Sequence, residues 1–340
     1  MERIKNEVKI SGVLVKNNLK LGTNKSGVQC INGDLILRTS DGGEHIINVY
    51  CDAITSKMEN GTRTYTGNEN PAFKGLQTVL GYQGLDVNPN GNLILTTNSG
   101  TYNINDYINK DNELKSIYKM SANYFTSSTN NIDVNKLTCE ISLNGIIQEI
   151  REEIQNDVIT GNYIVDFLVI NTKGGWKKGS TDAEVDNCFP VELFLPKSLV
   201  DGFQQAGYYV GCYTNLVANV INIQKTEEKV TKMAFGNDKI EKINIFKRYN
   251  EINSGALPIN PIDIGLDQDI IDVLISKRKT KLDEIKKAGY LGSKNNSVTG
   301  LTNNLAEKTN PFSKANSQSG SSQTINQATN PFGKGNPFVK

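Results

Sequence analysis

The stretch Lys197-Ser198-Leu199-Val200-Asp201-Gly202-Phe203-Gln204-Gln205-Ala206-Gly207 predicts a short helix set between strands. Its large apolar residues fall on one helical face, and its last glycine suits a C-terminal cap. The segments on either side, 191–195 and 208–223, are rich in Val, Leu, Ile and Tyr, which is typical of β-strands. From Cys139 onward the order is three strands, a helix and two strands. An OB-fold, a five-stranded and partly open barrel, has this order.

Strand patterns continue over most of residues 8–250, where short apolar runs are cut by Asn, Gly and Asp turns. The candidate strands are 8–15, 34–39, 45–53, 92–97, 115–125, 139–150, 163–171, 191–195, 208–223 and 243–249. About half of them fall on each side of Asn130. The predicted fold class is therefore mainly β: two tandem OB-fold barrels, followed by a C-terminal helix and a disordered tail.

The two halves also resemble each other in sequence. Val8, Ile10 and Leu14 alternate around Gly12 as Ile141, Leu143 and Ile147 do around Gly145, an offset of 133 residues. The next two strand pairs keep the order with offsets of 132 and 144. A glycine inside a strand commonly marks a bend. Duplication explains the pattern, and a chance match of alternating strands is the alternative. In the first half only residues 76–80 could serve as the helix.

Composition excludes most catalytic chemistries. The chain has 340 residues and one histidine, His45, so a His-bearing triad or a multi-His metal site would have to be built around one ring. Its five cysteines show no Cys-x-x-Cys spacing, which excludes the usual zinc and redox patterns. We expect four of them to be core residues, while Cys188 lies at the edge of a polar loop. No enzyme activity, cofactor or metal is predicted.

Overall charge and hydropathy favour a cytoplasmic protein. Lys plus Arg total 37 against 36 for Asp plus Glu, so any anion site must be local. No apolar run approaches the length of a membrane span, which is about 18 residues or more. Residues 1–5 lead into a polar segment without the apolar core of a signal peptide.

Four regions follow from these patterns. We expect a first barrel over residues 1–130, a second over 131–256, a linker with an amphipathic helix over 257–292, and a disordered tail over 293–340. The helix is predicted from Asp267 to Lys287, with Gly289 as its stop. Docking of its apolar stripe on the neighbouring barrel and self-association both fit.

The tail repeats a short sequence motif that contains an exposed phenylalanine. Thr309-Asn310-Pro311-Phe312 returns as Thr329-Asn330-Pro331-Phe332, and Asn336-Pro337-Phe338 follows. Phe312, Phe332 and Phe338 are candidate partner-binding residues, because repeated motifs in a tail suit multivalent capture. Low-complexity drift is the alternative.

The most informative loop is Asn171-Thr172-Lys173-Gly174-Gly175-Trp176-Lys177-Lys178-Gly179-Ser180-Thr181. A lone tryptophan is usually a core residue, but here lysines rather than apolar residues flank it. An exposed indole can stack on bases at about 1 to 3 kcal/mol each, and lysines can follow phosphates. The candidate nucleic-acid-binding residues of this loop are Lys173, Trp176, Lys177 and Lys178.

Basic residues alternate with aromatic ones elsewhere, a pattern that suits single strands and that ordinary solvated strands also show. In the second half the candidates are Lys225, Lys232, Lys242, Phe246, Lys247, Arg248 and Tyr249. In the first half they are Arg38, Tyr50, Arg63, Tyr65, Phe73 and Lys74, each of which also fits a structural role.

Residues 138–250 resemble the single-stranded-DNA-binding proteins of bacteria and their phages. The resemblance rests on Leu143-Asn144-Gly145, the Trp176-Lys177-Lys178 loop, the strand 191–196, the helix, and Gly207-Tyr208-Tyr209-Val210-Gly211. It implies that Trp176, Lys177 and Lys178 hold the DNA strand. With a second barrel the arrangement is similar to replication protein A. The family ends in an acidic tip, whereas this tail is basic, which puts recruitment of the same partners in doubt.

The resulting hypothesis is a non-catalytic protein that coats single-stranded DNA during replication or recombination of a phage or mobile element, in the host cytoplasm. Its expected partners are single-stranded DNA and, through the tail, replication or recombination proteins, with no membrane contact. A structural or protein-interaction scaffold built from OB-folds is one alternative. An RNA-binding or strand-annealing factor is another.

Overall fold

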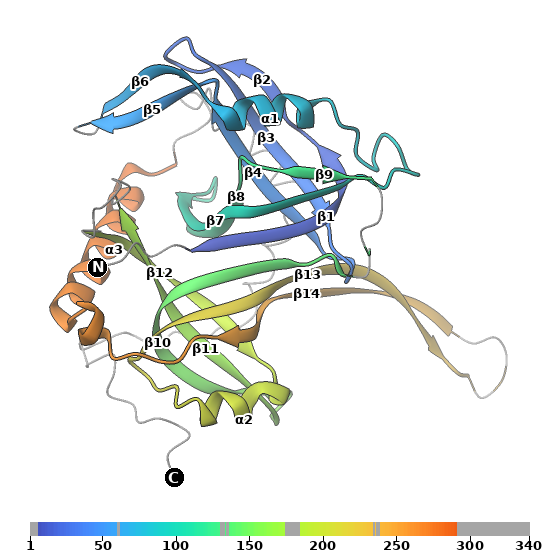
Figure 1. Ribbon diagram of the computed structural model, residues 1–340. Helices are drawn as coiled ribbons and strands as arrows, with labels where there is room; N and C mark the ends of the chain where they lie inside the picture. The colour runs from blue at the N-terminus through green and yellow to red at the C-terminus, as the bar shows by residue number, and fades with distance from the viewer. Residues whose placement is uncertain are drawn as a thin grey trace.

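The computed structural model describes residues 6–59, 62–129, 133, 136–173, 184–233, 235 and 239–290 (Figure 1). This part of the chain is mainly β, with a long helix near its C-terminal end. None of its helices is long and apolar enough to cross a membrane.

Five strands in the first half pair in a closed circuit. They are β1 (Glu7–Asn17), β3 (Gln29–Arg38), β4 (Glu44–Asp52), β7 (Ile94–Ile108) and β8 (Leu114–Ser121). β1 pairs with β3 and β3 with β4, β4 lies parallel to β8, β8 pairs with β7, and β7 returns to β1. The helix α1 (Pro71–Leu80) separates the third strand of this first circuit from the fourth.

Five strands in the second half repeat that order. They are β10 (Cys139–Gln155), β11 (Val158–Lys173), β12 (Glu184–Leu195), β13 (Tyr213–Thr231) and β14 (Lys239–Gly255). β10 pairs with β11 and β11 with β12, β12 meets β14 in parallel, β14 pairs with β13, and β13 returns to β10. The helix α2 (Lys197–Gln205) again follows the third strand, as predicted.

The two circuits join through their first strands. β1 and β10 pair antiparallel, and Val8 lies opposite Ile141, the residue with which the sequence repeat aligns it. The join therefore pairs equivalent positions of the two first strands. One continuous apolar core runs through both circuits and includes Leu14, Leu37, Leu143 and Phe167.

The two aligned glycines are required by close approach of neighbouring strands. A Cβ on Gly12 would lie 2.9 Å from the Leu37 Cβ. A Cβ on Gly145 would lie 2.1 Å from the Leu168 carbonyl oxygen, a distance that real atoms do not adopt. Glycine in these strands thus allows the sheet to bend over the core.

Several smaller elements were not predicted. β2 (Lys20–Thr23) pairs with β3, β9 (Thr126–Ser128) pairs with β7, and β5 (Ile54–Glu59) forms a separate hairpin with β6 (Thr62–Glu69). β13 begins at Tyr213 rather than at residue 208, and both β13 and β14 run well beyond the predicted ends at 223 and 243–249. Most of their added residues are polar, with Val230, Ile240 and Ile252 as exceptions, so the apolar pattern ends before the pairing does.

The first helix corrects a prediction. It begins at Pro71 rather than at Leu76, because the Asn70 side chain caps it by accepting a hydrogen bond from the Ala72 backbone at 3.1 Å. The fixed φ angle of proline suits the first position of a helix, so the pair Asn70-Pro71 in the sequence indicates where this helix begins. The residues Ala72, Phe73, Leu76 and Val79 are buried.

The predicted C-terminal helix is confirmed as α3 (Gln268–Ala288), which follows the 3-10 turn η2 (Pro261–Ile264). Asp267 caps its start and Gly289 follows its end. Ile271 and Leu274 are buried against residues of β10, β11 and β12, so the helix docks on strands of the second circuit. All five cysteines are buried, including Cys188 in this contact.

Candidate nucleic-acid interface

The tryptophan loop is anchored at both ends beside the first circuit. Trp176, Lys177 and Lys178 themselves lie outside the described residues, as do Phe312, Phe332 and Phe338 of the tail. Lys173 ends β11 opposite Glu184 of β12. Two residues earlier, the Asn171 side chain donates to Asn187 Oδ1 at 2.9 Å and to Asn103 Oδ1 of β7 at 3.2 Å. The loop therefore leaves the sheet where the two circuits meet.

The β13–β14 hairpin carries most of the other predicted residues of the second half. Its strands pair from Leu216 opposite Gly255 to Thr231 opposite Lys239, and the outer part extends away from the rest of the molecule (Figure 1). Because side chains alternate along a strand, the predicted set divides between two faces. Lys242, Phe246 and Arg248 share the face that continues from the buried Ala218. Lys247 and Tyr249 share the opposite face, and the side chain of Lys225 lies outside the described residues.

The core-side face, defined by Lys242, Phe246 and Arg248, meets the first circuit. Phe246 is 51% exposed. The Arg248 Nε donates to Asn222 Oδ1 at 3.0 Å, and the Asn222 amide donates to the Glu44 carbonyl oxygen at the start of β4. Burial lowers the pKa of Arg248, which stays far above neutral pH.

Glu44 also binds an arginine of the first circuit. Arg38 of β3 donates from Nη2 to Glu44 Oε1 at 2.6 Å. Arg38 and Arg248, which are 210 positions apart in the sequence, are thus linked through Glu44 and Asn222. We call this set the inter-circuit junction. Sequence reasoning named both arginines but missed Asn222, because an asparagine in a polar strand gives no signal.

The opposite face of the hairpin carries an aromatic pair. The Tyr249 ring lies 5.0 Å from the Phe194 ring of β12 at an angle of 54°. Burial raises the pKa of Tyr249, and Glu251 raises it further. Lys247 is exposed beside the pair, and Lys232 is exposed beyond the end of β13. This face offers stacking surface with cations nearby.

In the first circuit the predicted residues Tyr50, Arg63 and Tyr65 converge on the buried carboxylate of Asp52. Arg63 Nη1 donates to Asp52 Oδ2 at 2.9 Å, and the Tyr65 and Tyr50 hydroxyls lie 3.2 and 3.0 Å from its two oxygens. Asn24 donates to Asp52 Oδ1 at 2.8 Å. These bonds attach the β5–β6 hairpin to β4, so the cluster has a structural role whatever else it binds.

Two neighbouring predictions have different outcomes. Phe73 is only 7% exposed and packs in the core, so its prediction as a contact residue was wrong. It faces inward because Ala72, Phe73, Leu76 and Val79 form the buried face of α1. Lys74 is exposed on the same helix.

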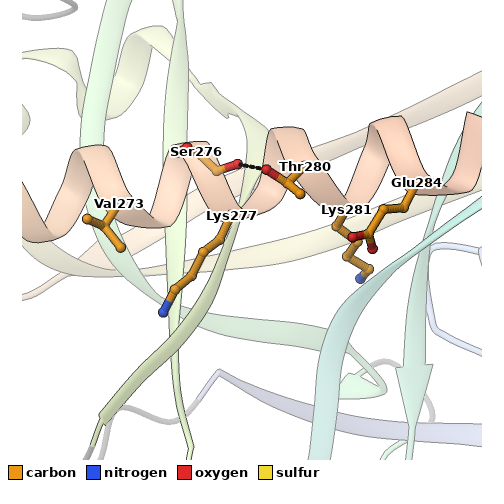
Figure 2. Close-up of a pocket in the computed structure, with 6 residues that line it drawn as sticks. All are labelled: Val273, Ser276, Lys277, Thr280, Lys281 and Glu284. Atoms are coloured by element: carbon orange, nitrogen blue, oxygen red, sulfur yellow. Dashed lines mark hydrogen bonds between the residues drawn. The ribbon is translucent and has the colours of Figure 1, made fainter.

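α3 adds basic residues that the sequence analysis had not assigned to an interface. A shallow hollow of about 330 Å³ lies along this helix. Figure 2 shows the residues that line it, which are Val273, Ser276, Lys277, Thr280, Lys281 and Glu284. Thr280 Oγ1 donates to the Ser276 carbonyl oxygen at 3.0 Å. Within the described ranges, no group of three or more His, Cys, Asp or Glu side chains is placed to hold a metal ion.

Comparison with known proteins gives a family model and similar solved structures. Residues 5–288 match the family model described as YorF. None of the curated proteins matches the chain. The wild-type single-stranded DNA binding protein from Thermus aquaticus is similar to it, with 12% identity, a TM-score of 0.40, and coverage of 76% of this chain and 94% of that chain. A deletion mutant of that protein has 11% identity, a TM-score of 0.39, and coverage of 76% and 97%.

Proposed function

The chain belongs to the YorF family, and we propose that it binds single-stranded DNA without catalysing a reaction on it. The proposal rests on two barrels and on the cationic and aromatic surface that joins them. Its aromatic side chains can stack on unpaired bases, and its cationic side chains can attract phosphates, which are the two interactions that bind single strands.

We infer that each circuit is an OB-fold, with domains over residues 1–130 and 131–256. The support is the pairing order of first, second, third, fifth, fourth and again first strand, with a helix after the third, which both circuits share. OB-folds bind oligonucleotides on a strand face and on adjacent loops. Two such modules in one chain raise affinity through effective concentration.

The observation that carries the proposal is the inter-circuit junction. Arg38 and Arg248 come from different circuits and are held within one chain of hydrogen bonds, and the half-exposed Phe246 lies on the same hairpin face as Arg248. A strand that stacks a base on Phe246 would place neighbouring phosphates near these guanidinium groups. Such a strand would pass from one barrel to the other without a break.

Other predicted residues extend this path. Lys225, Lys232, Lys242, Lys247 and Tyr249 belong to the same hairpin, and we include Lys173, at the end of β11, together with Trp176, Lys177 and Lys178 in the proposed path. The setting we propose is replication or recombination in a phage or mobile element, in the cytoplasm. Recruitment of partners by Phe312, Phe332 and Phe338 belongs to the same proposal.

The test is a titration of labelled oligonucleotides followed by fluorescence anisotropy. We expect single-stranded DNA to bind more tightly than duplex, and Phe246→Ser to weaken binding about tenfold, which is 1.4 kcal/mol and within the stacking range. Tyr124→Ser is the matched control, because Tyr124 is 56% exposed and belongs to neither hairpin strand.

Two results would contradict the proposal. Absence of binding at low salt would leave the scaffold alternative in its place. Tighter binding of RNA than of DNA with the same sequence would show that the ligand is RNA. Stacking and phosphate contacts by themselves do not distinguish the two.

A further inference from the structure

An aromatic and acidic groove lies where the two circuits meet. Its volume is about 430 Å³, and its walls include Tyr118 and Pro190 together with the carboxylates of Glu149, Asp166 and Glu192. Tyr118 comes from β8 of the first circuit, and the others come from the second. The groove is therefore made only when the two circuits are joined.

The aromatic wall of the groove is fixed in place. The Tyr118 ring stacks on Tyr102 with centroids 5.6 Å apart and lies 6.4 Å from the Phe189 ring. Its hydroxyl donates to the Pro190 carbonyl oxygen at 2.7 Å. The ring still has 42% of its surface exposed. An aromatic side chain of a ligand can pack there without ordering the wall first.

The opposite wall carries an excess of negative charge. Arg151 Nη2 lies 3.3 Å from Asp166 Oδ1 and 2.6 Å from Glu192 Oε2, so two carboxylates share one guanidinium, and Glu149 is a further acidic residue of the lining. Burial raises the pKa of Asp166, Arg151 opposes that shift, and Glu192 and Glu149 add to it. A second cation beside an aromatic ring would therefore complement the two carboxylates that share Arg151.

The chain carries that combination three times in its last 48 residues. The tail repeats extend to a shared pattern, Asn-Pro-Phe-x-Lys, at 310–314, 330–334 and 336–340. Each copy places a phenylalanine two positions before a lysine, and residues 293–340 hold five lysines against one glutamate. Their structure lies outside the described residues, but their chemistry is complementary to the groove.

We propose that the groove binds an Asn-Pro-Phe-x-Lys repeat of the chain's own tail, with the phenylalanine against Tyr118 and Pro190 and the lysine among the carboxylates. The proline restricts the backbone of the repeat, which lowers the entropy cost of docking. Three copies compete for the groove and raise its occupancy. This inference is independent of DNA binding.

The distances permit intramolecular docking. Gly289, just after α3, faces the Asn112 side chain at the turn between β7 and β8. From Asn112 to Tyr118 the strand spans about 20 Å at roughly 3.3 Å per residue. The first repeat begins 20 residues after Tyr290, and a chain of that length can span at most roughly 65 Å. The first repeat is therefore close enough to reach the groove.

The test is zero-length carbodiimide cross-linking of the full chain without nucleic acid, followed by peptide mass mapping. We expect products at the mass of one chain that join Lys314, Lys334 or Lys340 to Glu149, Asp166 or Glu192. Replacing Phe312, Phe332 and Phe338 together by Ser should reduce their yield at least fivefold. Replacing Leu301 and Leu305 by Ser, apolar tail residues outside the repeats, should leave the yield unchanged.

A competition experiment adds an independent measurement. A synthetic peptide of residues 308–316 in excess should lower the yield of these cross-links, and a scrambled peptide of the same composition should not. Cross-links spread over carboxylates outside the groove, products found only between two chains, or an unchanged yield in the triple phenylalanine variant would overturn the proposal. None of these outcomes depends on whether the protein binds DNA.

Discussion

Arg278 of α3 holds the Asp106 carboxylate of β7 with two hydrogen bonds, from Nη1 to Oδ2 at 3.3 Å and from Nη2 to Oδ1 at 3.1 Å. The Asp106 side chain has no exposed surface, and that of Arg278 is 13% exposed. α3 packs its apolar face on strands of the second circuit, while Asp106 belongs to the first. The helix therefore fastens the two circuits to each other.

Asp106→Asn should destabilise the protein by about 3 kcal/mol, because removing one partner of a buried ion pair leaves the other charge uncompensated. Urea unfolding followed by circular dichroism measures this loss. Asp111→Asn, on the exposed turn of the same hairpin, should change stability by less than about 0.5 kcal/mol. Equal effects of the two substitutions would show that the buried pair does not hold α3 in place.

His45 should make stability fall in mild acid. The ring is buried, its Nδ1 has no hydrogen-bond partner in the described part of the chain, and its Nε2 lies 3.1 Å from Thr39 Oγ1. Burial lowers its pKa to about 4. The unfolded chain binds the proton near pH 6.5 and the folded chain resists it, so stability is lost as pH falls from about 6.5 to about 4.

The expected loss from this histidine is about 3 kcal/mol, and it levels off below pH 4. Urea titrations at a series of pH values measure it as the difference between the native chain and His45→Gln. The substituted chain should lack this component of the pH dependence. Parallel curves for the two proteins over pH 4 to 7 would rule out the assignment to His45.

Gly145→Ala should disrupt the second circuit. The added methyl group would lie 2.1 Å from the Leu168 carbonyl oxygen, a backbone atom that cannot move without breaking the pairing of β10 with β11. We expect a loss of about 3 kcal/mol or more. Gly202→Ala is the matched control, because its Cβ meets nothing within 4 Å and α2 should gain up to about 1 kcal/mol. Thermal unfolding should separate the two variants, and a stable Gly145→Ala protein would refute the close approach.

The salt dependence of DNA affinity should identify the arginines that contact phosphates. For a single strand the logarithm of affinity falls with that of salt by about 0.7 per phosphate contact. Arg38→Met and Arg248→Met should each reduce this slope by about 0.7. Arg63→Met should leave it unchanged, because Arg63 lies on the separate β5–β6 hairpin and is not part of the inter-circuit junction. Equal slopes for all three variants would remove the inter-circuit junction from the DNA path.

Local patterns in the sequence were sufficient to predict much of the architecture. Apolar alternation and the glycines at positions 12 and 145 predicted the repeated strand order, and periodicity with a terminal glycine predicted α2 and α3. Phe73 was misassigned because an aromatic beside a lysine looks exposed until the helix that turns it inward is known. The hairpin strands β13 and β14 were predicted to end too early because polar residues in paired strands give no periodic apolar pattern.

What the sequence determined alone is the set of elements and the types of residue they carry, since periodicity, caps and composition are properties of neighbours in the chain. Only the tertiary structure decided which of those residues meet. Arg38 and Arg248 are linked by backbone and amide contacts at Glu44 and Asn222, and strand alternation separated Phe246 from Tyr249. Contacts between distant segments depend on which strands pair and in which register. A shift of one residue would turn every side chain of a strand to the other face of the sheet.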